Sequence, residues 1–453
     1  MRFLRIAALA LDKSIARVAD SLEFTRGRVV PGSLTASVWP RLTTDLVGQL
    51  KRGTILFTGV NGKTSSGHFL SSILRQAGHV PLHTVQGSGT LEEIAACLIE
   101  ATTAVGKISA DYGVFGCDED LLRPAVEACA PTIISLNNLY PDGVGYPGGA
   151  EGVAREWQRL FATMSPRQTL LVNADDPILC SSFTRSIPPP LVYFGVEDEK
   201  LKTDGSLTRM ARCARCQNRI TYRLVCLSHL GDYTCETCGW ERPMPTVYAV
   251  HVDAAPDESR FRIITPVGPI DVRLRIPGIH SIYNAVAAAA AALTLNIAPA
   301  VIRRGLELIT PMAGRNELLA ISNRQAQINL IKNPTSLNEA LRTSLRGGTG
   351  GRYLFLVDEV VENGFDLSWI WDADLTVLQG RTTSLYIAGS GAEHLALRIK
   401  HAGGEVTGVL PDIQEAFHHA MRNTPQTERL WVMATEAALF ELRQDLITLG
   451  VVG

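Results

Sequence analysis

Short apolar runs alternate with amphipathic segments over residues 54–200 of this chain. The apolar runs predict buried strands, and apolar residues spaced by three or four positions predict helices. The predicted strands are 54–58, 112–116, 131–136, 168–173 and 191–195. The predicted helices are 66–77, 91–104, 121–129 and 150–164. Because strands and helices alternate, the pattern predicts an α/β fold with a parallel sheet between two layers of helices.

A second alternation begins near residue 320 and continues to the C-terminus. Its predicted strands are 326–331, 353–357, 384–388, 405–409 and 429–433. Its predicted helices are 336–346, 375–379, 392–402, 412–422 and 436–447. We therefore predict a C-terminal Rossmann-like α/β domain at 311–453, preceded by an N-terminal helical segment at 1–50 and a central domain at 51–310.

Composition places the chain among globular proteins. Of its 453 residues, 46% are hydrophobic and 19% are charged, which suits several packed domains. The net charge of −2 argues against a general nucleic-acid binder. No apolar run reaches the roughly 18 residues of a transmembrane helix, and Asp12 and Lys13 interrupt the short apolar run near the N-terminus. We therefore expect a cytoplasmic protein without a transmembrane segment, and contact of the N-terminal helix with the inner membrane face is a lesser alternative.

Residues 54–77 place a buried strand, a glycine loop and a helix in that order. The loop is Gly59-Val60-Asn61-Gly62-Lys63-Thr64. Its glycines allow backbone N–H groups to turn inward, Lys63 and the helix N-terminus add positive charge, and the Thr64 hydroxyl can bind Mg²⁺. An ordinary strand-to-helix turn is the alternative, because so short a pattern is common. The order of the three elements favours a nucleotide site formed by Gly59, Asn61, Gly62, Lys63 and Thr64.

Three further positions are candidates for binding. Asp175 and Asp176 follow the strand 168–173, where ligands of parallel sheets lie, yet a turn with a helix cap explains them equally well. His280 and Asn284 share one face of a first helical turn, as a cap with a packed histidine or as nucleotide contacts. Arg315 can reach a phosphate.

Five of the nine cysteines cluster between residues 213 and 238. Cys213 and Cys216 form one C-x-x-C pair, and Cys235 and Cys238 form another. Two such pairs are typical of a tetrahedral Zn²⁺ site, whereas disulfides are disfavoured in a cytoplasmic protein. We therefore predict a structural zinc-ribbon insert at 207–243 within the central domain, with Cys226 as a bystander.

Together and in this order, the motifs resemble the Mur ligase family. GVNGKT, NADDP, GIHSIYNAVAA and Gly314-Arg315 match its ATP-binding and following domains. The four-cysteine insert, KNPTSLN at 332–338 and NGFDLSWIWDAD at 363–374 resemble one branch of the family, MurT, the synthetase subunits of lipid II isoglutaminyl synthases. The resemblance covers nearly the whole chain and implies a Mur ligase-like P-loop central domain.

The resemblance also implies a reaction. An ATP-dependent amide ligase would phosphorylate the D-glutamate α-carboxylate of the lipid II stem peptide, and ammonia would displace the phosphate to leave D-isoglutamine. A GatD-like glutamine amidotransferase subunit would supply the ammonia. Lys63 would serve catalysis by holding phosphates, Thr64 would hold Mg²⁺, and Asn284 and Arg315 would contact the nucleotide. Asp366 matches the aspartate that completes the partner's Cys–His pair.

Two departures from the family pattern keep alternatives open. Gly116 stands where the family has a glutamate for Mg²⁺ and catalysis, and residues 139–146 lack the arginine and most acids of the family's loop. Asp118 or Glu119 is a candidate replacement, although a shift of two residues moves a carboxylate by roughly 6–7 Å. The alternatives are a catalytically weakened nucleotide-binding paralogue and a Mur-type ligase with a different carboxylate substrate.

Overall fold

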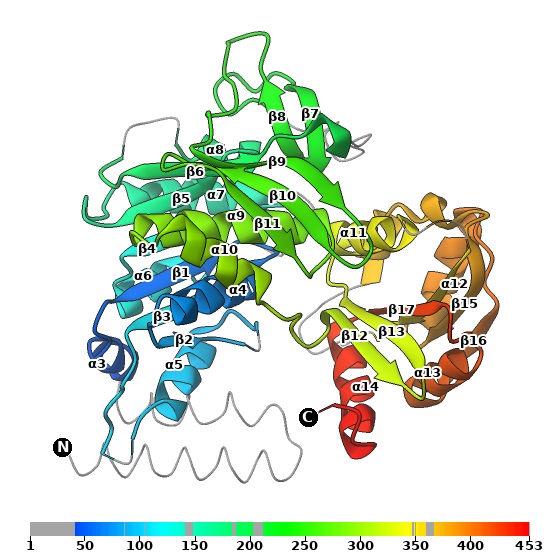
Figure 1. Ribbon diagram of the computed structural model, residues 1–453. Coiled ribbons are helices and arrows are strands. Elements are labelled where there is room, and N and C mark those ends of the chain that lie inside the picture. Colours follow the sequence, from blue (N-terminus) through cyan, green and yellow to red (C-terminus); the bar gives the residue numbers. More distant parts are fainter. Residues whose placement is uncertain are drawn as a thin grey trace. The chain divides into compact units, whose positions relative to one another are not determined.

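The computed structural model describes residues 41–452 except 86, 104, 141–147, 184–186, 203–211, 347, 349 and 359–366. These residues form two compact units (Figure 1). The first contains the described residues up to Asp253, with Arg260–Leu274 and His280–Ile309. The second contains Ala254–Ser259, Arg275–Ile279 and the described residues from Thr310 onward. Of the predicted N-terminal segment, only 41–50 is described, and it holds α3 (Leu42–Val47).

A nine-stranded sheet forms the centre of the first unit, in the order β11-β10-β9-β6-β5-β4-β1-β3-β2. Its strands are β1 (Thr54–Thr58), β2 (Pro81–His83), β3 (Tyr112–Cys117), β4 (Ile133–Leu136), β5 (Thr169–Asn173), β6 (Leu191–Val196), β9 (Val247–Ala254), β10 (Ser259–Ile264) and β11 (Ile270–Leu274). The pairs from β2 to β9 in this order are all parallel. The prediction of a parallel α/β sheet is therefore confirmed. Every residue of β1 is buried, and its three central residues, Ile55, Leu56 and Phe57, are apolar, as expected for a strand covered on both faces.

Helices cover this sheet. They are α4 (Lys63–Gln76), α5 (Leu91–Glu100), α6 (Leu122–Cys129), α7 (Gly149–Phe161), α8 (Pro177–Ser181), α9 (Ile279–Thr294) and α10 (Pro299–Glu307). The alanines at 285 and 287–292 in α9 are fully buried, because small side chains let neighbouring elements approach this helix closely. Gly305 of α10 makes such an approach, since a Cβ there would overlap Ile73 of α4.

A small antiparallel hairpin separates the two cysteine pairs. It consists of β7 (Thr221–Leu227) and β8 (Leu230–Thr234), which form a two-stranded sheet of their own. The hairpin lies between β6 and β9 in the chain, so it is inserted into the sheet topology without joining the sheet.

The second unit has a six-stranded sheet in the order β12-β13-β17-β14-β15-β16. Its strands are β12 (Arg315–Ile321), β13 (Arg324–Leu330), β14 (Gly351–Leu356), β15 (Thr382–Ala388), β16 (Gly408–Leu410) and β17 (Arg429–Ala434). Its α-helices are α11 (Pro334–Leu345), α12 (Ala392–His401), α13 (Ile413–Arg422) and α14 (Glu436–Thr448). Strand β12, which the sequence analysis did not predict, pairs antiparallel with β13, whereas the other pairs are parallel.

Alternation along β14 explains the two cores of this unit. Tyr353 and Phe355 belong to one buried cluster, and Leu354 and Leu356 belong to another. Successive strand residues point to opposite faces, so helices must cover both sides of the sheet. The helix predicted at 375–379 is a 3₁₀ helix, Leu375–Leu378, since a segment of this length does not complete two α-helical turns.

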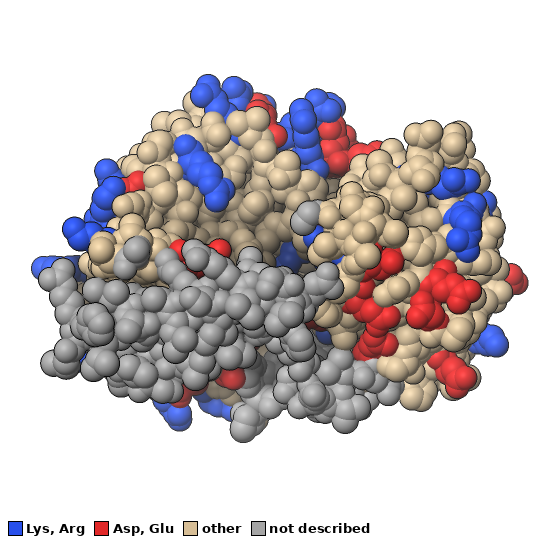
Figure 2. All heavy atoms as spheres, turned by 90° about the horizontal axis from the view of Figure 1, so that it is seen from below, with Lys and Arg blue, Asp and Glu red and all other residues tan. Residues whose placement is uncertain are grey.

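The described helices and one face of the surface can be compared with the expectations from composition. Among the described residues, no helix is long and apolar enough to cross a membrane. Figure 2 shows one face of the molecule, on which the lysine and arginine side chains lie in several separate groups.

Candidate functional site

The glycine loop lies directly after the central strand β1, at its carboxyl end. Gly59 and Gly62 have φ values of 134° and 90°, which side chains of L-residues rarely adopt. A Cβ at Gly59 would lie 2.8 Å from the backbone N and O of Asn138, and one at Gly62 would overlap the Asn284 amide. Both positions thus require glycine, for conformation and for space.

Asn138, directly after the neighbouring strand β4, holds the loop in place. Its Oδ1 accepts a hydrogen bond from Asn61 N, and its Nδ2 donates one to Asn61 O, both at 2.9 Å. Its backbone oxygen also accepts from Val60 N at 3.2 Å. Three hydrogen bonds to two consecutive loop residues fix the path of the backbone between the glycines.

A second amide pair connects the loop helix to α9. Asn137 Nδ2 donates to Ser66 Oγ at 2.9 Å, and Ser66 Oγ donates to Asn284 Oδ1 at 3.2 Å. Asn284 is buried and lies beside Gly62. The structure therefore brings Asn284 to the loop, although Ser66 and Asn284 are 218 residues apart in the sequence.

Lys63 lies in the first turn of α4 with its ammonium group folded back over the loop. Nζ donates to Gly59 O at 2.8 Å and lies 2.9 Å from Asp118 Oδ1 and 3.9 Å from Glu119 Oε1. Burial lowers the pKa of Lys63, but the carboxylates of Glu119 and Asp118 raise it by more, so the pKa lies above its ordinary value. Lys63 is therefore charged at neutral pH.

Gly116 of β3 faces the same lysine. It is the partner of Phe57 in β1, and a Cβ there would lie 3.4 Å from Lys63 Cβ. A side chain at 116 would thus extend along the start of α4. With glycine in this position, the carboxylates near Lys63 come from Asp118 and Glu119, which follow β3.

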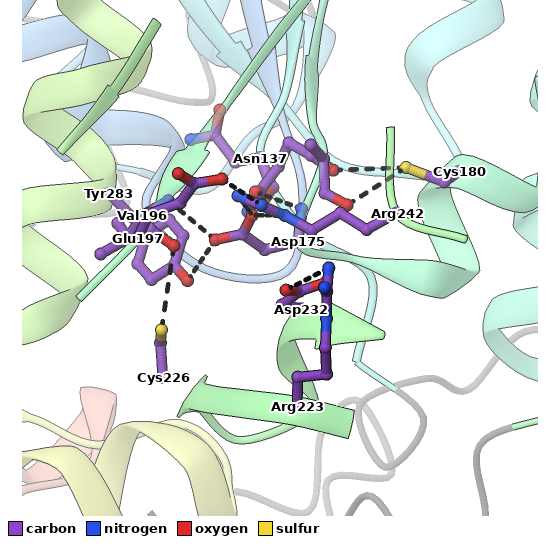
Figure 3. A network of polar contacts seen from close by, with 12 residues as sticks. Asn137, Asp175, Cys180, Val196, Glu197, Arg223, Cys226, Asp232, Arg242 and Tyr283 are labelled. Carbon is purple, nitrogen blue, oxygen red and sulfur yellow. Dashed lines mark hydrogen bonds and ion pairs between the residues drawn. The ribbon is translucent and has the colours of Figure 1, made fainter. Parts of the chain in front are cut away.

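The acid doublet Asp175–Asp176 has a different environment. Asp176 caps α8, because its Oδ1 accepts from Ile178 N and Leu179 N at 2.8 and 3.1 Å. Asp175 pairs with Arg242, and both of its carboxylate oxygens are occupied (Figure 3). Both acids are fully buried. Of the two interpretations left open by the sequence, this geometry favours the structural one.

The four predicted zinc ligands come together in the insert. The sulfur atoms of Cys213, Cys216, Cys235 and Cys238 all lie within 4.8 Å of one another. Cys213 Sγ lies 3.4 Å from Cys238 Sγ, and Cys216 Sγ lies 3.5 Å from Cys235 Sγ. Tetrahedral zinc with bonds of about 2.3 Å requires sulfurs roughly 3.8 Å apart, so the donor set fits this metal.

Two similar backbone turns position these sulfurs. In the first, Cys213 N donates to Asn218 O and Gln217 N donates to Cys213 O, and Gln217 has a φ of 63°. In the second, Cys235 N donates to Trp240 O and Gly239 N donates to Cys235 O, and Gly239 has a φ of 69°. The Asn218 backbone N–H lowers the pKa of Cys216 to about 6, whereas burial raises the pKa of Cys213 to about 12, so Cys216 is the thiol more readily converted to the thiolate that binds metal.

Comparison with known proteins places the chain in a family. The family model described as "Mur ligase middle domain" matches residues 57–230, and the one described as "MurT ligase C-terminal" matches residues 330–439. The chain belongs to the Mur ligase family. It is 25% identical over 410 residues, 90% of each chain, to the protein named lipid II isoglutaminyl synthase (glutamine-hydrolyzing) subunit MurT of Staphylococcus aureus strain N315. It is also 25% identical to the protein of that name from Streptococcus pneumoniae R6, over 94% of each chain.

Solved structures show the same fold. A pseudomurein peptide ligase type C from Methanothermus fervidus superimposes with a TM-score of 0.66 at 21% identity, covering 88% of this chain and 79% of that one. MurF ligase from Thermotoga maritima in complex with ADP superimposes with a TM-score of 0.64 at 11% identity, covering 92% and 84%. The predicted Mur ligase-like fold is thereby confirmed.

Apart from the four cysteines, the predicted site residues of this Mur ligase family member fall into three groups. The structure brings Gly59, Asn61, Gly62, Lys63, Thr64 and Asn284 together around one loop. Arg315 begins β12 in the second unit, so it belongs to the other compact body. Asp366 lies outside the described residues.

Sequence analysis missed Asn137 and Asn138 as residues that support the loop. The available signal was their position, since two amides directly follow the apolar strand 131–136 at its carboxyl end. It also missed Arg242, which the chain places just after the second cysteine pair.

Proposed function

We propose that this chain is the synthetase subunit of a lipid II isoglutaminyl synthase, an ATP-dependent amide ligase of peptidoglycan biosynthesis. One observation carries the proposal: a glycine loop with a charged, largely buried lysine occurs in the same chain as a segment, 330–439, that matches the MurT ligase model. The similarity to the two MurT proteins over at least 90% of their length supports it.

The chemistry consists of two displacements. A carboxylate oxygen of the D-glutamate α-carboxylate in the lipid II stem peptide attacks the γ-phosphorus of ATP, and ADP leaves. Ammonia then attacks the carbonyl carbon of the acyl phosphate, inorganic phosphate leaves and an amide remains, so that D-glutamate becomes D-isoglutamine. Because the reaction uses both ATP and membrane-borne lipid II, it would take place on the cytoplasmic side, at the inner membrane face.

The loop residues would hold the nucleotide. Backbone N–H groups at 59–64 and the Lys63 ammonium group would bind the phosphates, and the Thr64 hydroxyl would hold Mg²⁺, which neutralises phosphate charge. Asn284, beside Gly62, would contact the nucleotide from α9. Lys63 would exchange its present partner Asp118 for phosphate, which leaves Asp118 and Glu119 as the acids nearest the metal. Arg315 would serve as a further phosphate contact.

The partner would be a GatD-like glutamine amidotransferase subunit that hydrolyses glutamine to ammonia. Asp366 would complete the partner's Cys–His pair by orienting the histidine, a role that rests on the resemblance of NGFDLSWIWDAD to the family's motif. The four cysteines would hold a structural Zn²⁺, because four thiolates leave no open coordination position for a reaction.

A second candidate function is a catalytically weakened, nucleotide-binding paralogue. Gly116 favours it, because the space beside Lys63 Cβ is left without the family's glutamate. A third is a ligase for another carboxylate, which the altered residues 139–146 favour.

A mass-spectrometric amidation assay distinguishes these functions. The purified chain is incubated with lipid II, ATP, Mg²⁺ and ammonium, which replaces the partner. The proposal predicts a carboxylate-to-amide mass change that requires ATP and disappears in Lys63→Ala. ATP binding without product would favour the paralogue, and product from a different stem peptide alone would favour the third function.

A further inference from the structure

Asp175 is a buried acid whose hydrogen-bonding capacity is fully used. Its Oδ1 accepts from Arg242 Nε at 2.7 Å, and its Oδ2 accepts from Tyr283 OH at 2.7 Å and from Val196 N at 2.9 Å. Arg242 Nη2 makes a second contact with Oδ1, also at 2.7 Å (Figure 3). No oxygen of Asp175 is left for a ligand, so its role must be exerted through these partners.

The cation that pairs with Asp175 comes from the four-cysteine insert. Arg242 follows the second cysteine turn, and its backbone N donates to Tyr233 O of β8. Gly231, in the same hairpin, donates from its backbone to Asp175 O at 2.9 Å. The turn that positions Cys235 and Cys238 therefore also positions the guanidinium group, a few residues further on.

Space and charge confine this guanidinium group. A Cβ at Gly195 of β6 would overlap Asp175 Oδ1 and lie 2.8 Å from Arg242 Nη2, so glycine makes room for the ion pair. Glu197 Oε1 accepts from Arg242 Nη1 at 2.6 Å. Burial lowers the pKa of Arg242, but Asp175 and Glu197 raise it by more, so the group stays charged.

Two paths of contact lead from Asp175 to the glycine loop. In the first, Tyr283 binds Asp175, and the next residue, Asn284, lies beside Gly62. In the second, Asp175 N donates to Asn173 Oδ1 at 3.1 Å, and Asn173 Nδ2 donates to Asn137 O at 2.9 Å. Asn137 in turn contacts Ser66 of the loop helix, which completes the path.

We infer that Arg242 is a positioning residue that couples metal binding in the four-cysteine insert to nucleotide binding at the glycine loop. Metal fixes the turn before Arg242, Arg242 and Asp175 fix the first turn of α9, and Asn284 is thereby held beside Gly62. The inference rests on the proposed nucleotide site. Coupling of this kind is reciprocal. Nucleotide must therefore lower the Kd for the metal by the same factor by which the metal lowers the Kd for nucleotide.

The test measures the Kd for zinc of the full-length chain by equilibrium competition with a chromogenic chelator, with and without saturating MgADP. The Kd for MgADP is measured first by calorimetry. The decisive variant combines Asp175→Asn with Arg242→Met, which removes both charges together and leaves no buried charge unpaired. The matched control combines Arg223→Met with Asp232→Asn, an ion pair of 2.7 Å on the same hairpin, in which the arginine is exposed and the two side chains bind each other rather than Asp175 (Figure 3).

In the wild-type chain and in the control, MgADP is expected to lower the Kd for zinc by about tenfold, within the ~5- to 150-fold range of typical couplings. In the Asp175→Asn, Arg242→Met chain, zinc and MgADP still bind but the factor falls close to one. If nucleotide only stabilised the fold in general, MgADP would strengthen zinc binding equally in this variant and in the wild type, and that result would overturn the inference. A wild-type chain that does not bind MgADP would instead overturn the nucleotide site itself.

Discussion

Two regions at the carboxyl edge of the first sheet place an acid beside a cation, and they differ in how completely the charges are enclosed. At the glycine loop, the Lys63 side chain is 11% exposed and the Asp118 side chain 34% exposed. At the insert, the exposed fractions for Arg242 and Asp175 are 5% and 0%. Lys63 makes contacts that a phosphate can replace, whereas Asp175 has every oxygen occupied by protein groups.

The comparison shows how the proposed nucleotide site differs from a structural support built of the same residue types. A partly exposed pair costs little to separate, because water and ligand oxygens can replace the lost partner. A fully enclosed pair cannot separate without leaving a buried charge.

Arg242→Ala should have the largest effect on stability. It leaves the Asp175 carboxylate buried without its cation, so the free energy of unfolding should fall by about 3–5 kcal/mol. Denaturant unfolding measures this change. Arg262→Ala is the matched control, since Arg262 pairs with Asp271 on an exposed surface and should change stability far less. Equal effects of the two substitutions would show that the enclosed pair has no special role.

Lys63→Ala should leave the fold intact and remove ATP turnover. Loss of a cation that stabilises charge developing on phosphate lowers turnover by about 10²–10³-fold. Phosphate release in the presence of lipid II and ammonium reports the effect, and circular dichroism checks the fold. Lys51→Ala, which removes an exposed lysine paired with Asp111, serves as the control. Undiminished turnover in Lys63→Ala would refute the assignment of the loop.

Asn138→Ala should weaken nucleotide binding without touching the nucleotide. It removes two side-chain hydrogen bonds to Asn61, worth about 1 kcal/mol each, so the Kd for MgADP should rise roughly tenfold. Calorimetry measures the Kd. Asn423→Ala, an exposed amide on another element, should leave it unchanged. A normal Kd in Asn138→Ala would mean that the loop keeps its path without this support.

Gly116→Glu tests whether Asp118 replaces the family's glutamate. The nearest atom to a new Cβ is Lys63 Cβ at 3.4 Å, an ordinary contact, so the variant should fold. We expect Asp118→Asn to lower amidation about tenfold and Gly116→Glu to restore it in that background. Amide formation is followed by mass spectrometry. Full activity of Asp118→Asn alone would mean that another residue takes the role of the family's glutamate.

The pH dependence of stability should show a small contribution from Lys63. Its pKa in the folded chain lies above the ordinary 10.5, so this contribution is complete below pH 10.5 and is lost as the pH rises through the folded pKa. Denaturant unfolding between pH 9 and 12 should show a smaller decline for Lys63→Met than for the wild-type chain. An identical decline would mean that Asp118 and Glu119 do not stabilise the charged lysine.

Much of the fold was predictable from local patterns. Alternating apolar and amphipathic segments gave the strands β1, β3, β4, β5 and β6 in the right places, because a doubly covered sheet requires apolar runs. The three-residue strand β2 has no such run, and β12 does not follow the apolar pattern, because it exposes Leu318 and buries Asn316, so neither was predicted. The cysteine spacing was equally informative, since each C-x-x-C pair closes within a single turn.

The sequence by itself thus determined the glycine loop, the four-cysteine cluster and the two α/β alternations, all of which depend on residues close together in the chain. Only the tertiary structure decided that Asn138 supports Asn61 across 77 residues and that Arg242 encloses Asp175 across 67. The reason is that such contacts depend on which strands become neighbours. Strand β4 lies beside β1, and the insert returns to the end of β5. The spacing of residues close together in the chain predicts neither arrangement.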